Sequence, residues 1–221
     1  MKRDLYILTQ DSRFFYNAVQ VLKSHCIRFK ALNFGPNAYR PANWSLILTT
    51  KEEKPLIKQT RTQKVFAFDP DIDPEIFLLR VLSEQLGIAS NHLLTVGIDP
   101  GRTNTGVAYL VDKKTIFTYT THDISLIPTY VHTFSAAFPN HKHLVLKIGN
   151  GVPRLTKTFL NILRVQPNLP AQLFVELVDE KNTSLKKYKR WSPSRAVKTR
   201  DEMAAIKIAH RDGIKVEFLA H

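Results

Sequence analysis

The 221-residue sequence has a single cysteine, Cys26, which excludes an internal disulfide and a metal site built from several thiolates. We expect Cys26 to be a small buried apolar residue in a reducing, cytoplasmic setting. No apolar run approaches the roughly 18 residues of a membrane span, and the polar residues after Leu8 argue against a signal peptide. An apolar fraction of 43% predicts a globular protein. Because no run is long enough to span a membrane, we expect no membrane partner.

Positive charge is in excess, with a net charge of +13. Residues 1–90 contain 13 Lys and Arg against nine Asp and Glu, whereas residues 91–221 contain 19 against 10. Fixed cations gain affinity for polyanions by releasing the counterions of phosphate groups. The surplus in the second half therefore favours a nucleic acid, DNA or RNA, as the partner.

Residues 1–90 read as a small, Rossmann-like α/β domain of unknown role. Its pattern predicts strands at 5–9, 28–34, 44–49 and 64–68, a helix from Asp11-Ser12 to about His25, and another from Pro74 to Gly87. This part has no Gly-rich phosphate loop. Its acids Asp69, Asp71 and Asp73 lie in a Pro-rich turn, and we interpret them as turn and cap residues rather than metal ligands.

Residues 91–221 are expected to form a second α/β domain, with the boundary near Gly87–His92. The first strands, at 93–98, 106–110 and 115–120, suggest an antiparallel meander because Asp112-Lys113-Lys114 is typical of a turn. Helices and strands then alternate: a helix at 126–138, a strand at 144–148, a helix at 154–165, a strand at 173–178, and a last helix from Ser192-Pro193 to near Gly213.

Acidic residues recur at three informative places in this second half. Asp99 ends the first apolar strand before a Pro-Gly turn, Asp179-Glu180 ends the last apolar strand, and Asp201 lies in the final helix. Ends of neighbouring strands in an α/β sheet bring functional groups together. Converging carboxylates repel one another unless a cation is present, and Mg²⁺ prefers hard oxygen ligands. A pair of such ions can hold the attacking and leaving oxygens of a phosphodiester displacement.

Four motifs in order carry a family resemblance. Ile98-Asp99-Pro100-Gly101 followed by Thr105-Gly106-Val107-Ala108 resembles the first motif of the ribonuclease H-like superfamily, in its RuvC and YqgF branch. Val178–Ser184 is similar to that branch's Asp-Glu-Arg-x-Thr-Thr motif, and Asp201–Ile206 to its Asp-x-x-Ala-Ala helix. Ile148–Pro153 occupies the place of its glycine- and proline-containing turn. The resemblance covers about residues 93–221 and leaves out the first 87.

The resemblance implies a ribonuclease H-like mixed sheet flanked by helices, and a nuclease acting on ribosomal RNA precursors or branched DNA. It implies that Asp99, Glu180 and Asp201 are catalytic acids that hold Mg²⁺ or Mn²⁺. Each residue has another interpretation. Asp99 could cap the turn, Asp179 could replace Glu180, and Asp201 could pair with Lys198 three residues earlier on a helix.

The chain departs from the family pattern at two places. RuvC has a glutamate in its fourth strand, where this chain has Lys147, and this difference favours the YqgF type over a junction resolvase. The arginine of the later motif is Lys181 here, and its first threonine comes at Thr183. Lysine keeps the charge but loses the planar fork that grips phosphate.

Residues 181–200 carry eight basic side chains and no acid. Such a run is often a solvated face, but this one joins two proposed catalytic acids and contains aromatic residues that can stack on unpaired bases. The arginine of the first turn can meet a phosphate. The residues expected to contact nucleic acid are Arg102, Lys181, Lys186, Lys187, Lys189, Arg190, Trp191, Lys198 and Arg200.

Two other classes of protein compete with a nuclease. In actin-like ATPases and sugar kinases the phosphate loop also follows a Gly-Ile-Asp-x-Gly strand. Those proteins need two such domains, and this chain has the length for one copy. A non-catalytic nucleic-acid-binding relative that keeps the fold is the stronger alternative. A homodimer would suit a two-fold junction, and the sequence shows no interface that would decide the oligomeric state.

Overall fold

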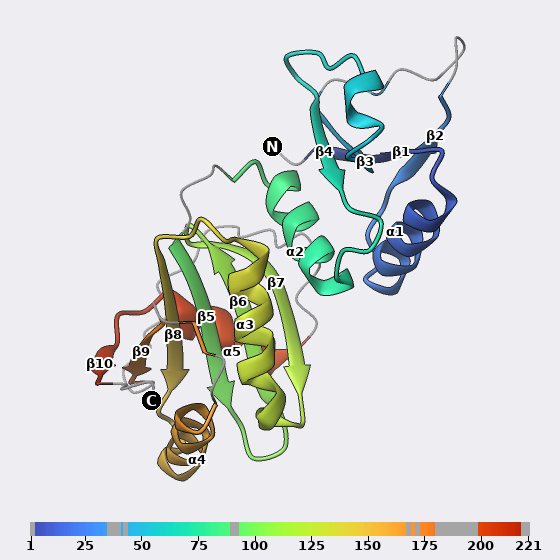
Figure 1. Cartoon of the computed structure of the whole chain (residues 1–221). Helices are drawn as coiled ribbons and strands as arrows, with labels where there is room; N and C mark the ends of the chain where they lie inside the picture. The colour runs from blue at the N-terminus through green and yellow to red at the C-terminus, as the bar shows by residue number, and fades with distance from the viewer. Residues whose placement is uncertain are drawn as a thin grey trace. The chain divides into compact units, whose positions relative to one another are not determined.

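The computed structural model describes residues 3–34, 41, 44–88, 93–166, 169–170, 173–179 and 199–217. The chain divides into two compact units, Met1–Ile88 and Ala89–His221, and each contains its own sheet with helices (Figure 1). The chain is therefore an α/β protein. No helix in the described ranges is long and apolar enough to cross a membrane.

The first unit has a four-stranded sheet in the order β2-β1-β3-β4, with all its pairs parallel. Its elements are β1 (Asp4–Leu8), α1 (Ser12–Ser24), β2 (Lys30–Leu32), β3 (Ser45–Thr50), the short helix η1 (Lys54–Leu56), β4 (Lys64–Phe68) and α2 (Pro74–Gln85). This is the strand and helix order that the sequence predicts.

Side-chain caps fix both long helices of this unit. The carboxylate of Asp11 accepts a hydrogen bond of 2.8 Å from the Phe14 N–H, and Asp73 accepts hydrogen bonds from the N–H groups of Glu75 and Ile76. The acids of the Pro-rich turn therefore include the cap that the sequence predicts. The expectation that Cys26 is buried is wrong. Cys26 is exposed, with a φ of 55° in the turn that ends α1.

The second unit has a six-stranded sheet in the order β10-β9-β8-β5-β6-β7. Its strands are β5 (Leu93–Pro100), β6 (Thr105–Val111), β7 (Lys114–Thr121), β8 (His143–Gly149), β9 (Leu173–Val178) and β10 (Ile214–Val216). Its helices are η2 (Ile124–Leu126), α3 (Ile127–Ala137), α4 (Pro153–Arg164) and α5 (Arg200–Ala209).

Strand β5 pairs with one neighbour in each direction, antiparallel on one side and parallel on the other. It is antiparallel to β6, which is antiparallel to β7, and it is parallel to β8, which is parallel to β9. The sheet is therefore mixed, with the antiparallel meander that the sequence predicts. The carboxyl ends of β5, β8 and β9, at Pro100, Gly149 and Val178, lie along one edge of the sheet, which we call the carboxyl edge.

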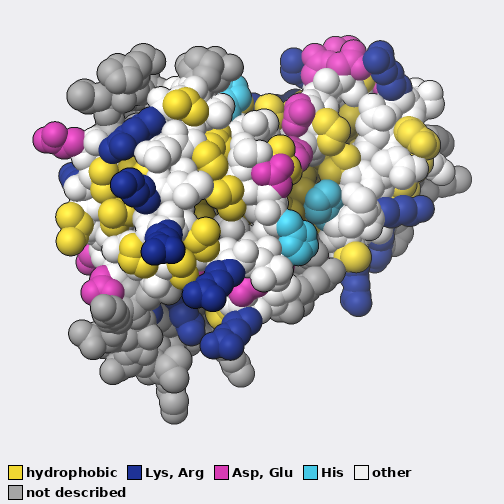
Figure 2. Space-filling model, turned by 90° about the horizontal axis from the view of Figure 1, so that it is seen from below, with side chains coloured by type: hydrophobic (Ala, Val, Ile, Leu, Met, Phe, Trp, Pro, Cys, Tyr) yellow, Lys and Arg dark blue, Asp and Glu magenta, His cyan; other side chains and the backbone are white. Residues whose placement is uncertain are grey.

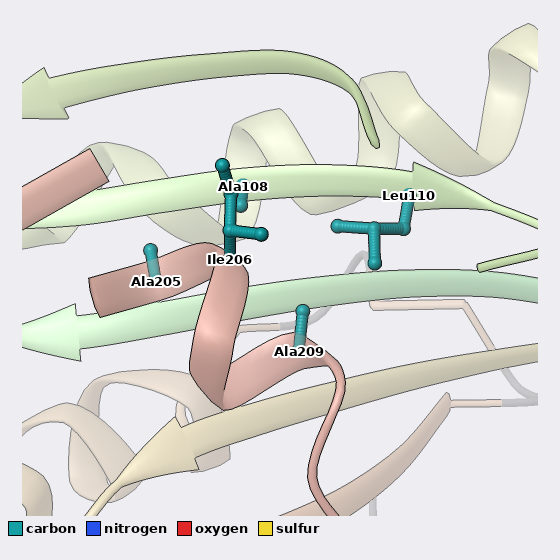
Figure 3. Close-up of a cluster of buried hydrophobic side chains, with 5 residues drawn as sticks. All are labelled: Ala108, Leu110, Ala205, Ile206 and Ala209. Carbon is teal, nitrogen blue, oxygen red and sulfur yellow. The ribbon is translucent and has the colours of Figure 1, made fainter. Parts of the chain in front are cut away.

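Helices cover both faces of this sheet. Tyr109 of β6 packs on Phe134 of α3 with ring centroids 4.7 Å apart. The next residue back, Ala108, points the other way and joins a buried cluster with α5. Figure 3 shows this cluster, in which Ala108 and Leu110 face Ala205, Ile206 and Ala209. Because strand side chains alternate, α3 and α5 lie on opposite faces.

The final helix differs from the sequence prediction. It begins at Arg200 rather than at Ser192-Pro193, because Thr199 has extended dihedral angles and its hydroxyl accepts a hydrogen bond of 3.1 Å from the Glu202 N–H. It ends at Ala209, and the unpredicted strand β10 follows it. Lys198, the alternative partner of Asp201, lies outside the described residues.

Candidate active site at the carboxyl edge of the second sheet

Asp99 lies one residue before the end of β5 and is half-buried. It is paired directly with Gly106 of β6, and residues opposite each other in antiparallel strands share a face, with Cα atoms about 4.5–5.5 Å apart. Gly97 is two residues earlier and packs against α5, so strand alternation directs Asp99 to the same face. The Asp99 side chain therefore belongs to the side of the sheet that α5 covers.

Asp201 reaches the same place because Gly106 has no side chain. A Cβ atom on Gly106 would collide with the carbonyl group of Asp201 and would come within 3.1 Å of the Glu202 backbone nitrogen. The first turn of α5 thus rests directly on the residue that faces Asp99. The fold therefore places the backbone of Asp201 against the residue opposite Asp99, although the two acids are about a hundred residues apart in the chain.

The helical spacing of α5 supports the same arrangement. Asp201 precedes Ala205 and Ala209 by four and eight residues, so the three share one stripe of the helix. The carbonyl oxygen of Ala205 and the Cβ of Ala209 both lie where a side chain on Gly97 would be. The stripe that carries Asp201 is therefore the one that packs over β5, the strand of Asp99.

Glu202 is a site residue that the sequence reasoning missed. It is 3% exposed, and its Oε2 accepts a hydrogen bond of 2.8 Å from the hydroxyl of Thr118 on β7. Two residues further along β7, the hydroxyl of Thr120 lies 3.0 Å from the hydroxyl of Thr199, the residue that caps α5. Both contacts attach the start of α5 to β7. The available signal was the spacing Thr199-x-x-Glu202, which is typical of a helix start.

The second acid of the predicted set, Glu180, lies outside the described residues. Its alternative, Asp179, follows β9 and is exposed. Glu176 of β9 faces the α5 side, where it lies 3.4 Å from Lys147, so strand alternation directs Asp179 to the other face. This disfavours Asp179 as a partner of Asp99.

Asp99 and Asp201, on the same side of the sheet, have donor groups that fit a hard divalent cation. Asp99 and Asp201 offer carboxylate oxygens, which Mg²⁺ and Mn²⁺ accept as ligands. Within the described ranges, no group of three or more His, Cys, Asp or Glu residues is arranged to hold a metal.

Two of the predicted nucleic-acid-binding residues are described. Arg102 lies in the loop between β5 and β6, and Arg200 is the first residue of α5, and both are exposed. Arg102 therefore follows Asp99 closely, and Arg200 directly precedes Asp201. The other predicted contacts, Lys181, Lys186, Lys187, Lys189, Arg190, Trp191 and Lys198, lie outside the described residues.

Lys147, which stands where the resemblance to RuvC would have a glutamate, has defined partners on the neighbouring strands. It pairs with Gly97 in the β5–β8 ladder, and its ammonium lies 3.4 Å from the Glu176 carboxylate and donates a hydrogen bond to the Arg211 carbonyl. Both partners of the ion pair are largely buried. The lysine therefore links β8, β9 and the chain after α5, two residues away from the carboxyl edge.

Comparison with known proteins adds no assignment, since no protein-family model matches this chain and no curated protein is significantly similar to it.

Proposed function

We propose that the second unit is a divalent-metal-dependent nuclease of the ribonuclease H-like kind, which hydrolyses phosphodiesters in structured nucleic acid. The observation that carries the proposal is the packing of Asp201 on Gly106, the residue opposite Asp99. Two carboxylates held at the end of a central strand are what a metal-dependent hydrolase needs, and two carboxylates without a cation would repel each other.

The fold class and the charge support the same proposal. The element order, three antiparallel strands followed by alternating helices and strands and a last helix, agrees with the order of the four sequence motifs. The mixed sheet with helices on both faces is the class that the resemblance implies. The basic excess of the second half suits a polyanionic substrate.

In this proposal each residue of the carboxyl edge has a role. Asp99 and Asp201 hold Mg²⁺ or Mn²⁺, with Glu180 as the third ligand on the strength of its motif alone. The bound metal would activate water and neutralise charge on the scissile phosphate. Arg102 and Arg200, exposed beside the two acids, would orient the phosphate by donating hydrogen bonds to its oxygens. Thr118 and Glu202 would keep the first turn of α5 in place.

The direct test is cleavage of end-labelled branched DNA and structured RNA in Mg²⁺ or Mn²⁺. Asp99→Asn and Asp201→Asn each remove a charge while keeping the side-chain shape, and each should reduce cleavage by at least about 100-fold. Asp212→Asn, which changes an exposed acid after α5, is the matched control and should cleave normally. Cleavage that is indifferent to Asp99→Asn would contradict the proposal.

The third ligand is assigned by comparing neighbours. Glu180→Gln should reduce cleavage as strongly as Asp99→Asn, whereas Asp179→Asn should leave most of the activity. The reverse result would transfer the ligand role to Asp179. Wild-type activity in both variants would leave only two protein carboxylates for the metal and would contradict the three-acid site.

A non-catalytic nucleic-acid-binding protein is the second candidate. It is favoured by the engagement of Lys147 with Glu176 where the resemblance to RuvC would have an acid. It predicts salt-sensitive binding of RNA or DNA that survives Asp99→Asn, with no cleavage of any substrate. The nuclease predicts cleavage by the wild-type chain.

A further inference from the structure

The outer face of α4 carries an uncompensated row of positive charge. Arg154, Lys157 and Arg164 are exposed, while Phe159 and Leu163 on the other side of the helix are buried. The three basic residues and Asn161 follow at steps of three, four and three, which puts them in one stripe. Counting 1.5 Å per residue, the stripe is about 15 Å long.

No acid balances this stripe within the same part of the chain. The sequence has no Asp or Glu between Asp123 and Glu176. Helix α4 therefore has none of the opposite-charge side-chain pairs that are common on exposed helix faces. Figure 2, which views the molecule from below in Figure 1, shows Lys and Arg side chains gathered on the face at which α4 lies.

The stripe begins at the carboxyl edge. The hydroxyl of Thr156 donates a hydrogen bond of 3.0 Å to the carbonyl of Gly149, the last residue of β8. Ile148, just before it, pairs with Ile98 of β5, next to Asp99. The first turn of α4, with Arg154, is therefore fastened beside the proposed catalytic edge, and Lys157 and Arg164 lead away from it.

The chemistry of the stripe matches a phosphodiester backbone. Asn161, exposed within the stripe, supplies a neutral amide donor of the kind that contacts phosphate and sugar, whereas the Thr158 hydroxyl donates its hydrogen bond of 3.0 Å to the Arg154 carbonyl. The outer face has no aromatic residue on which an unpaired base could stack, in contrast to surfaces that bind single strands. The surface therefore suits a duplex recognised through its backbone.

We propose that the exposed stripe Arg154-Lys157-Arg164 of α4 binds the sugar–phosphate backbone of a double-stranded segment of nucleic acid and so directs it along the carboxyl edge. The proposal rests on the proposed function for its substrate class. It adds a binding surface outside the segment 181–200 and the catalytic acids, and it names the duplex part of the substrate as the part that α4 holds.

The test is the salt dependence of duplex binding by the full chain, measured in EDTA so that no cleavage occurs. Each phosphate contact contributes a slope of about 0.9 to the dependence of log affinity on log salt. Arg154→Gln combined with Lys157→Gln removes two contacts and should make this dependence less steep by about 1.8, so that over one decade of salt the affinity of the variant falls about 60-fold less than that of the wild type. Duplex RNA and duplex DNA should lose affinity alike.

Two matched variants separate charge on α4 from charge in general. Lys113→Asn with Lys114→Gln removes two exposed cations from the β6–β7 turn, at the other end of the strands, and should leave the slope unchanged; asparagine tolerates the φ of 63° at position 113. Arg154→Lys with Lys157→Arg keeps the charges and should keep the slope.

Two results would overturn the inference. One is an equal slope in wild type and the α4 variant, and the other is a loss of binding to anionic lipid vesicles with duplex binding intact. Failure of the nuclease proposal is recognised separately, by the cleavage assay in Mg²⁺. A chain that does not cleave can still show the α4 effect in EDTA, and a chain that cleaves can lack it.

Discussion

The hydroxyl of Thr118 on β7 donates a hydrogen bond of 2.8 Å to the carboxylate of Glu202 on α5, and both side chains are buried. This bond joins residues 84 positions apart and fixes the first turn of the helix that carries Asp201. A buried carboxylate that loses its donor keeps its desolvation cost. The stability of the second unit should therefore depend on this hydrogen bond.

We predict that Thr118→Val destabilises the second unit by about 2 kcal/mol, the cost of removing a partner from a buried charged group. The same strand offers a control, because Thr115 is also buried and its hydroxyl has no hydrogen-bond partner among the described residues. Thr115→Val should be neutral or stabilising. Hydrogen exchange of peptides from α5 and β7 measures both, and equal protection in the two variants would contradict the role of Glu202.

Gly106 should tolerate no side chain. We predict that Gly106→Ala costs about 1–3 kcal/mol, because its Cβ would push against the backbone of Asp201 and Glu202. The displacement should also reduce cleavage by up to about 100-fold, since small misplacements of catalytic groups are costly.

Gly97→Ala is the control for that effect. It crowds Ala205 and Ala209 further along α5 and should cost comparable stability with a smaller loss of cleavage. Hydrogen exchange of α5 and the cleavage rate, both at a temperature where the variants are folded, separate the two. Normal cleavage by Gly106→Ala would show that Asp201 does not act beside Asp99.

The elements themselves were largely predictable from local signals. Apolar runs marked the strands, and Asp11 and Asp73 marked helix starts through their cap geometry. The start of α5 was missed because Ser192-Pro193 is a good local cap signal, while the cap in use, Thr199, is supported by its contact with Thr120 on β7. Local propensity contains no information about such a contact.

The candidate site was predictable only in part for the same reason. Asp99 and Asp201 could be named from the motifs that contain them. The buried role of Glu202, in contrast, depends on Thr118, and the role of Gly106 depends on the close approach of α5. The strand β10 is three residues long, too short for an alternation pattern to be recognised.

The second unit should lose stability as the pH falls from 7 to 5, through His210. Burial lowers the pKa of His210, and the nearby charges of Lys147 and Lys113 lower it further. Between the lower folded pKa and the ordinary pKa near 6.5 the unfolded chain binds the proton more readily, so stability falls as the pH drops through this window.

Calorimetric unfolding at pH 7, 6 and 5 measures this dependence, with the transition of the second unit identified by its shift in Thr118→Val. His210→Asn should flatten the dependence. Lys113→Asn removes one of the two neighbouring charges and should weaken it. A His210→Asn variant whose transition falls with pH as steeply as that of the wild type would exclude His210 as the cause.

The carboxylate of Glu53 is the pH-sensitive point of the first unit. It accepts hydrogen bonds of 2.6 Å from the Thr9 hydroxyl, 2.6 Å from the Gln10 N–H and 3.0 Å from the Thr50 hydroxyl. Burial raises the pKa of Glu53, but these hydrogen bonds outweigh burial and hold the pKa below its ordinary value. The bonds join the loops that follow β1 and β3.

We predict that Glu53→Gln destabilises the first unit by about 1 kcal/mol at pH 7, because a neutral amide accepts these hydrogen bonds more weakly. A lowered pKa stabilises the fold above the ordinary value near 4.3 and ceases to do so as the pH falls through the folded pKa. The difference in unfolding free energy between wild type and Glu53→Gln should therefore shrink below about pH 4.

Urea unfolding in a Trp191→Phe background measures this difference, since Trp44 is then the only tryptophan. Glu52→Gln, an exposed neighbour, is the control, and a difference that persists unchanged at pH 3 would show that the charge of Glu53 is not what stabilises these loops.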